Sequence, residues 1–256
     1  MKSKVFVGFL FVLALLSGAC SREANQNQPV TTKTERGSST APPAEEVKKR
    51  DNALVRVIHA VPGAAAVDVF VDDQKAFSGV AYKTVTPYKE LSGERHTFRL
   101  RPAGMDAAQP LAENSEGLGD GKHYTVIALP GEDGRAVTLR VLEDELVPPS
   151  SGKARVRVIN ASNDAGEIDV YPQGKNEALF SGINFRSEGG YKEVDPMSGT
   201  LEIRPEGQNR PMLSISNVKF DAGKTYTIVI VGHTRATPRL EAITVEDQFS
   251  GPMAMR

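Results

Sequence analysis

Cysteine and tryptophan are nearly absent from this chain of 256 residues, which has one Cys and no Trp. A single cysteine excludes internal disulfides and any zinc site built from cysteines. Neither sign of charge is in excess, since 31 Lys and Arg face 32 Asp and Glu. The basic footprint of a nucleic-acid-binding protein is therefore missing, and we expect no nucleic-acid partner. Turn-forming residues are plentiful instead, with 23 Gly and 16 Pro, and they disfavour long helices.

Long apolar runs are also scarce, and the one at the N-terminus has the form of a targeting signal. Two lysines in Met1–Lys4 precede an apolar run over Val5–Leu16. A run of about 12 residues is too short to cross a bilayer as a helix and is typical of a signal peptide. It ends in Leu16-Ser17-Gly18-Ala19-Cys20, which resembles the end of a bacterial lipoprotein signal. Residues 1–19 are therefore predicted to be the signal peptide.

Cys20 is accordingly predicted to be the lipidated residue that attaches the protein to the lipid bilayer. Ser17 stands where such signals usually carry Leu, so an ordinary secretory signal cleaved after Ala19 is the alternative. Either signal predicts an extracytoplasmic location at the cell envelope, including the periplasm. Free thiols can form disulfides there, and a lone, acylated cysteine cannot. In a Gram-negative cell the resemblance implies the outer membrane, because Ser21 and not Asp follows the cysteine. Two or three acyl chains make such an anchor effectively permanent.

The segment after the anchor is predicted to be a tether. Residues 20–52 contain mostly Gln, Asn, Thr, Ser, Pro and charged residues, with no aromatic side chain. Because this composition cannot offset the entropy of ordering, we expect it to be disordered. Its root-mean-square reach is roughly 30 Å, at ~5–6 Å × √n. The last residues, 249–256, are expected to fray.

An internal repeat organises the rest of the chain. Val67-Asp68-Val69-Phe70 returns as Ile168-Asp169-Val170-Tyr171, and Tyr88-Lys89-Glu90 returns as Tyr191-Lys192-Glu193. The offset stays near one whole domain length along the entire repeat, so this is a domain duplication and not a short solenoid period. We predict two domains, residues 53–148 and residues 153–248, joined by a short linker stiffened by two prolines.

Within each copy the pattern is that of β-strands. Val67, Val69 and Val71 alternate with polar or aromatic neighbours, which is the period of a half-buried strand. About seven short strands separated by turn signals predict an all-β fold, with two tandem antiparallel β-sandwiches of immunoglobulin-like or transthyretin-like kind. The stretch from Gly104 to Gly119 lacks a strand pattern, and we expect a long loop or a poorly paired strand there.

The repeat resembles a bacterial family known as domain of unknown function 4397 (DUF4397). The resemblance lies in a turn at His59-Ala60, the Val67–Val71 strand, Tyr88 near the middle, and Gly121-Lys122-His123-Tyr124-Thr125 near the end. It covers both copies, with Asn160 replacing the histidine in the second. The resemblance implies an extracytoplasmic, often lipid-anchored or cell-wall protein with one or more copies of the domain, and it implies no established activity.

A histidine–carboxylate pair is the first candidate for chemistry. His59 is followed by Asp68, and such a pair can do acid–base work or bind metal. The second copy keeps Asp169 but has Asn160 in place of the histidine. Because Asn can hydrogen-bond a turn but cannot titrate near pH 7, a structural role in both copies is favoured. The two aspartates are expected to bond backbone amides near a turn or to face solvent.

The spacing of the other histidines and acidic residues predicts no metal or cofactor. Three histidines show none of the usual metal-site spacings: His96, His123 and His233. Two acidic groups leave weak calcium binding open, although neither has the spacing of a calcium loop: Asp72 with Asp73, and Asp164 with Glu167 and Asp169. No nucleophile motif or nucleotide-binding glycine loop occurs, and we predict no catalytic residue.

Tyr88 and Tyr191 are tentative ligand contacts, with Tyr82 and Phe185 nearby. Exposed aromatic side chains stack on sugars or anchor partner proteins. The alternative is that these tyrosines belong to the core of the sheets or make an internal hydrogen bond of the tyrosine-corner kind.

The leading hypothesis is a membrane-anchored, non-enzymatic binding or adhesion-type module for an envelope polysaccharide or protein. A structural envelope spacer is the second hypothesis, and a hydrolase is the third. An exposed aromatic patch on both copies would favour binding. Carboxylates or histidines converging in a pocket would favour the enzyme, and a uniformly charged surface would favour the spacer.

Overall fold

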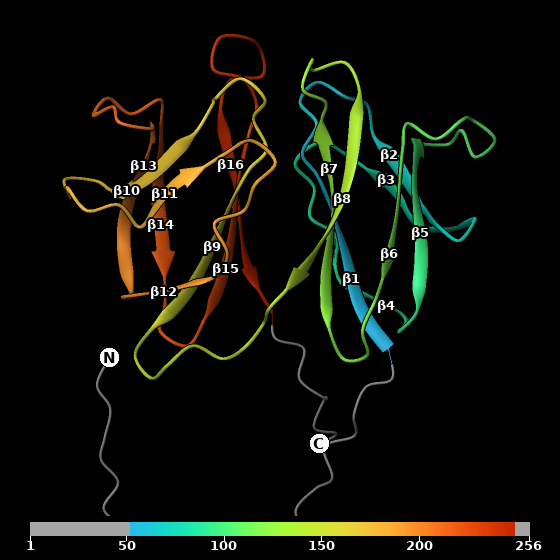
Figure 1. The fold of residues 1–256 in the computed structure, drawn as a ribbon, viewed down its shortest axis with the longest axis horizontal. Coiled ribbons are helices and arrows are strands. Elements are labelled where there is room, and N and C mark those ends of the chain that lie inside the picture. Colours follow the sequence, from blue (N-terminus) through green and yellow to red (C-terminus); the bar gives the residue numbers. More distant parts are fainter. Residues whose placement is uncertain (1–51, 249–256) are drawn as a thin grey trace, which may run out of the picture. The chain divides into compact units, whose positions relative to one another are not determined.

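The computed structural model describes residues 52–248, which lie within one compact unit of residues 46–256. The described residues form sixteen strands and no helix (Figure 1). A helix able to span a membrane is therefore not found between residues 52 and 248. The predicted signal peptide, the Cys20 anchor, the tether before residue 52 and the tail 249–256 lie outside the described residues.

Eight strands build each of two sandwiches, so the predicted tandem all-β fold is confirmed. The first sandwich contains β1 (Asn52–His59), β2 (Val67–Val71), β3 (Gln74–Val80), β4 (Lys89–Ser92), β5 (Arg95–Pro102), β6 (Ala112–Gly117), β7 (His123–Pro130) and β8 (Val137–Asp144). The second contains β9 (Ala154–Asn160), β10 (Ile168–Pro172), β11 (Phe180–Ile183), β12 (Lys192–Val194), β13 (Met197–Pro205), β14 (Leu213–Phe220), β15 (Thr225–Val231) and β16 (Glu241–Asp247).

The two sandwiches repeat the same topology strand for strand. The first has sheets in the order β4-β1-β7-β8 and β3-β2-β5-β6. The second has β12-β9-β15-β16 and β11-β10-β13-β14. All pairs are antiparallel, as predicted, except β1 with β7 and β9 with β15, which are parallel. The intervening strands of the opposite sheet supply the long connection that parallel neighbours require.

Burial explains which runs became central strands. Strands β7, β9 and β15 are buried along their whole length, and β1 is buried after its first residue. A strand covered on both faces reads as a continuous apolar run rather than an alternating one. Each sandwich has its own apolar core between its sheets. A third apolar cluster takes residues from both sandwiches, on the outer faces of their β1 and β9 sheets.

The expectation of a long loop or a poorly paired strand between Gly104 and Gly119 is wrong in part, because a regularly paired strand lies there. Residues 112–117 form β6, which pairs with β5 from Ala112↔Leu100 to Gly117↔Arg95. Half-buried and exposed residues alternate along β6, so the strand has the expected period of two. It was missed because an edge strand needs little apolar surface, and this one has only Ala112 facing the core.

The hairpin that follows the second strand of each copy differs between the sandwiches. In the first, Asp72 and Asp73 both have positive φ (47° and 68°) in a two-residue turn between the paired Val71 and Gln74. Positive φ at both central residues is the geometry that matches the twist of a tight hairpin. In the second sandwich β10 ends at Pro172 and β11 starts only at Phe180, so this hairpin is open.

Candidate functional site

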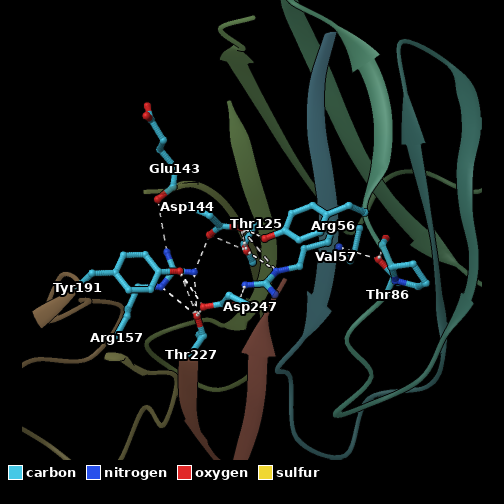
Figure 2. Close-up of polar contacts among 12 residues, drawn as sticks. Arg56, Val57, Thr86, Thr125, Glu143, Asp144, Arg157, Tyr191, Thr227 and Asp247 are labelled. Carbon is cyan, nitrogen blue, oxygen red and sulfur yellow. Dashed lines mark hydrogen bonds and ion pairs between the residues drawn. The ribbon is translucent and has the colours of Figure 1, made fainter. Parts of the chain in front are cut away.

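Two arginines and two aspartates form a buried network between the sandwiches (Figure 2). Arg56 on β1 contacts Asp247 on β16, with Nη2 2.7 Å from Oδ1. Arg157 on β9 contacts Asp144 on β8, with Nη2 2.6 Å from Oδ1. Arg56 also lies 3.6 Å from Asp144 through Nε. No side chain of the four is more than 2% exposed, so these charges depend on each other for compensation.

The network is reciprocal. Arg56 and Asp144 belong to the first sandwich, and Arg157 and Asp247 occupy the equivalent positions in the second. Each arginine pairs most closely with the aspartate of the other sandwich. A contact in which the same patch meets itself is the geometry of a two-fold symmetric dimer. The duplicated domains therefore pack as an internal, pseudo-symmetric pair.

Hydroxyl groups complete the coordination of the two aspartates. Thr125 Oγ1 donates to the carboxylate of Asp144 at 2.7 and 2.9 Å and accepts from Nε of Arg56 at 2.9 Å. Thr227 Oγ1 donates to Asp247 at 2.7 Å and accepts from Nε of Arg157 at 3.3 Å. Each copy therefore has a threonine at the equivalent position that links its own arginine to its own aspartate.

Asp144 and both arginines of the network are held in their charged forms. Burial alone would raise the pKa of Asp144, but Arg157 and Arg56, with hydrogen bonds from Tyr88 and Thr125, hold it below its usual value. Burial would likewise lower the pKa of Arg157, and the neighbouring carboxylates, led by Asp144, raise it instead. The paired groups stay ionised because each stabilises the charged form of the other.

Apolar side chains and peripheral contacts surround the network. The apolar cluster consists of Ile58, Ala60, Ile127, Leu129, Leu142, Ile159, Ala161, Val229, Val231 and Ile243. At the rim, Lys83 Nζ lies 2.5 Å from Glu241 of the second sandwich. At the equivalent place, Arg186 Nη2 donates to Thr138 of the first sandwich at 3.0 Å. The rim is therefore reciprocal as well.

Tyr88 and Tyr191, the predicted ligand contacts, both lie half-buried at this network. The Tyr88 hydroxyl donates to Asp144 at 2.6 Å, and the Tyr191 hydroxyl donates to Asp247 at 2.9 Å. Their rings also lie against guanidinium groups, 5.0 Å from Arg56 and 4.6 Å from Arg157. Both rings thus make the internal hydrogen bond named as the alternative, and a ligand contact at either stays a prediction.

His59 and Asn160 make the same turn contacts, which confirms the structural interpretation of this position. His59 Nε2 lies 3.2 Å from the carbonyl of Ala65, and its Nδ1 accepts from the amide of Val61 at 3.3 Å. Asn160 donates to the carbonyl of Gly166 at 2.9 Å and accepts from the next turn amide. Burial lowers the pKa of His59, so the ring is neutral.

Asp68 and Asp169 hold backbone amides, as expected. Asp68 accepts from the amide of Gly79 at 2.7 Å, and Asp169 accepts from the amide of Gly182 at 2.9 Å. Both glycines have positive φ, 63° and 72°, at an irregular point of the sheet pairing. Asp68 also accepts from the Gly104 amide and pairs with the ammonium of Lys75, whereas Asp169 has one further, long contact, from the Tyr171 hydroxyl at 3.5 Å. Neither aspartate contacts the equivalent turn histidine or asparagine.

His96 lies in a line of polar groups that the sequence did not reveal. Its Nδ1 lies 2.5 Å from Asp72, and its Nε2 lies 3.0 Å from the carbonyl and 3.2 Å from the hydroxyl of Ser92. Burial would lower the pKa of His96, but Asp72 and the Ser92 carbonyl raise it. A ring that donates from both nitrogens cannot take a proton from Ser92, whose hydroxyl bonds Glu94. The line resembles a catalytic triad in order but not in proton placement.

The other candidates for metal binding do not gather at one place. His123 packs edge-on against the ring of Tyr88, with centroids 5.2 Å apart. Asp73 pairs with Arg99 at 2.6 Å, and Asp164 bonds the hydroxyl and amide of Thr234. In the part of the chain that the structure describes, no three His, Cys, Asp or Glu residues form a group able to hold a metal ion.

A groove of about 770 Å³ lies in the second sandwich beside the open hairpin. Its walls come from the chain after β10, from β12 and from the start of β13. Apolar atoms are supplied by Leu179, Val194 and Met197, and the charged residues that line the groove have both signs, with Lys175 and Lys192 beside Glu177 and Glu193. The two-residue turn of the first sandwich has no such loop, so the sequence signal for the groove was the insertion after Pro172.

The arginines of the network were not predicted from the sequence. Arg56 and Arg157 stand in the middle of apolar strands, at the same place in both copies. A charged residue on a buried strand needs a partner, and its repetition was the available signal. Asp144 and Asp247 stand at the ends of β8 and β16. That the pairs form across the copies required the three-dimensional arrangement.

A model of the family described as "Domain of unknown function (DUF4397)" matches residues 53–171. The match covers the first sandwich from β1 and continues through most of β10 of the second. No curated protein matches the chain. A DUF4397 domain is therefore found in this chain, and the family carries no assigned activity.

Solved structures give only distant likenesses. The C-terminal domain of AlgF from P. aeruginosa is 18% identical, with a TM-score of 0.30, covering 38% of this chain and 99% of that one. A "putative cell adhesion protein" from Bacteroides uniformis is 9% identical, with a TM-score of 0.24, covering 77% and 98%. One of the same description from Bacteroides eggerthii is 8% identical, with a TM-score of 0.23, covering 79% and 98%. At these scores none of them bears on function.

Proposed function

We propose that this protein is a lipid-anchored, extracytoplasmic binding module made of two tandem DUF4397-type domains. The anchor rests on the signal ending at Cys20, and the tandem arrangement rests on the repeated topology of the two sandwiches. Acylated Cys20 holds the chain to the lipid bilayer, and the tether of residues 20–52 carries the sandwiches clear of the headgroups. The outer membrane is the location if the source is Gram-negative.

The groove of the second sandwich is the observation that carries the binding role. It combines apolar atoms of Leu179, Val194 and Met197 with charged side chains of both signs, and its volume is in the range of ligand sites. Strand β12, at its wall, is an edge strand of its sheet. An edge strand offers backbone hydrogen bonds to an added extended segment. We therefore propose an extended segment of an envelope protein as the partner.

The role is proposed to be non-catalytic. Both ring nitrogens of His96, the histidine nearest a serine and an aspartate, lie against acceptors, the Asp72 carboxylate and the Ser92 carbonyl. The ionised groups of the network are 0–2% exposed and are paired with one another. A substrate cannot reach such groups without opening the interface between the sandwiches.

A rigid envelope spacer is the second candidate, and the network favours it. Buried reciprocal ion pairs and a shared apolar cluster join the sandwiches. A spacer transmits distance only if its parts do not bend, and this interface would supply that stiffness. The spacer has no need of the groove, and this separates the two candidates experimentally.

Site-specific photo-cross-linking in intact cells tests the binding role. A photoreactive residue replaces Lys192 in the groove, and a matched control replaces Lys89, its equivalent in the first sandwich, which bonds the carbonyl of Ala76. One envelope protein cross-linked from position 192 and not from position 89 supports binding. A glycan at position 192 would keep the site and change the partner. Equal labelling, or none, at both positions would leave the spacer. Cys20→Ala should release the protein from the membrane.

A further inference from the structure

The pseudo-symmetry of the interface breaks at one position beside the two arginines. Val85 forms an isolated bridge with Ile58, and Glu188 forms the same bridge with Ile159. The neighbouring backbone bonds also correspond, from the amide of Thr86 to Val57 and from the amide of Gly189 to Val158. Val85 and Glu188 are therefore equivalent, and only the second copy has a carboxylate there.

Glu188 completes the coordination of Arg157. Its Oε2 lies 3.3 Å from Nη1 of Arg157, which also donates to the carbonyl of Glu143 at 3.4 Å. The other nitrogens of this guanidinium are held by Thr227 and Asp144. Every nitrogen of Arg157 thus has an acceptor.

Arg56 lacks the equivalent acceptor. Its Nε bonds Thr125, and its Nη2 pairs with Asp247. Among residues 52–248 its Nη1 makes no hydrogen bond and is not one of the fully buried atoms, whereas Nη2 is fully buried and has the ion pair with Asp247 but no hydrogen bond. The side chain is nevertheless only 2% exposed. A guanidinium donor that lacks a protein acceptor and is not fully buried can accept an added ligand group, and the second copy shows which group takes this place.

A pocket of about 450 Å³ opens at this end of the interface, with Arg56 in its wall. Val85, Thr86, Pro87 and Tyr88 line it from the first sandwich. Val245, Glu246 and Gln248 line it from the second. The carboxylate of Glu246 is paired with Lys224 at 2.7 Å, which compensates its charge. The pocket occupies the place that the Glu188 side chain fills at the other end.

We propose that this pocket binds a small ligand through a carboxylate, which takes the position at Arg56 that Glu188 takes at Arg157. The carboxylate accepts from Nη1 of Arg56, and the rest of the ligand packs against Val85 and Pro87. Guanidinium groups recognise carboxylates through directed, charge-assisted hydrogen bonds. The site is separate from the groove of the second sandwich, so either can fail without the other.

Acetate is the probe for this proposal, with acetamide as its uncharged control of similar shape. Backbone amide signals of the mature chain are followed by NMR while each probe is added at neutral pH and constant ionic strength. Acetate should shift the signals of Thr86, Tyr88 and Gln248 saturably, in the millimolar range, and acetamide should not. No saturable shift at these residues, or the same response to both probes, would overturn the proposal.

Two exchanged variants supply the matched controls, and Arg56 itself is left intact because it holds the interface. Val85→Glu places a carboxylate in the pocket and should abolish the acetate response. Glu188→Val opens the equivalent space at Arg157 and should add a second set of acetate shifts, at Gly189, Gly190 and Tyr191. An unchanged acetate response in a folded Val85→Glu protein contradicts the proposal. If that variant does not fold, Glu188→Val decides, and the absence of the second set overturns it.

Discussion

The two sandwiches share most of the face by which they meet, apart from Glu188 in place of Val85, and they differ at the ends of their hairpins. Arginine, threonine, tyrosine and aspartate recur at equivalent positions of the interface in both copies. Away from the interface, His59 and Asn160 make the same turn contact with different side chains. The tight hairpin turn of the first sandwich corresponds to an open hairpin in the second. The duplicated fold thus tolerates change wherever a side chain serves only its own copy. A residue that must meet its counterpart in the other copy is less free to change.

Removing a carboxylate from the network should have the largest effect. Asp144→Ala leaves two buried guanidinium groups short of a partner, because Asp144 lies within 3.6 Å of both arginines. We expect a loss of about 3–5 kcal/mol in the free energy of unfolding, measured by urea denaturation. Asp247→Ala should cost less, because Asp247 pairs with Arg56 alone. Asp195→Ala, at an exposed pair with Lys153, is the control and should cost at most about 1 kcal/mol. Equal losses for all three would refute the reading.

Asp68 and Asp169 test whether extra partners matter at the hairpin. Asp68→Asn should cost about 1–3 kcal/mol, because two backbone amides and Lys75 lose a charged acceptor, and Asp169→Asn should cost less. Burial opposes ionisation of Asp68, but Lys75 and the amides of Gly79 and Gly104 hold its pKa below the usual 3.8. Its contribution is therefore present above pH 3.8 and lost as the pH falls through the folded pKa. Acid unfolding curves that coincide for the wild type and Asp68→Asn would contradict this.

His96 has no counterpart in the second sandwich, where Gly199 takes the equivalent place. The pKa of His96 is raised above 6.5 in the fold, since Asp72 and the Ser92 carbonyl outweigh burial. Its contribution is thus complete below pH 6.5 and is lost as the pH rises through the folded pKa. We expect His96→Gln to cost about 1 kcal/mol at pH 6 and much less at pH 9. A loss independent of pH, by urea denaturation at both values, would exclude a charged ring.

The smallest effect is expected where the copies already offer the exchange. His59→Asn installs the residue of the second sandwich and should change stability at pH 7 by less than about 1 kcal/mol. Burial lowers the pKa of His59 below 6.5, so the unfolded chain takes up the proton first and stability falls as the pH drops below 6.5. The variant should lose this acid sensitivity. Thermal unfolding at pH 5 and pH 7 checks it, with Asn160→His as the reverse control.

Regular periodicity made the sandwiches predictable, and the contacts between copies were not. Alternating valines in Val67–Val71 and the returning Tyr-Lys-Glu segment were sufficient for two β domains. Strand β6 was not predicted because its inward face contributes only a small side chain to the core. The role of Arg56 was not predicted because its strand could be assigned from its apolar residues alone. The pattern of apolar and polar residues along the sequence indicates the periodicity of each strand. Contacts between residues about one domain apart depend instead on how the surfaces of the two folded sandwiches fit together.

The reciprocal interface also limits how many copies of this domain can pack against one another. A patch that meets its own equivalent is fully covered once two copies have met, so the contact closes and offers nothing to another copy. A chain that gained a third sandwich would leave one set of Arg, Asp and apolar side chains without a partner. Growth by whole pairs would leave none. The domain should therefore occur in even numbers, within one chain or between chains.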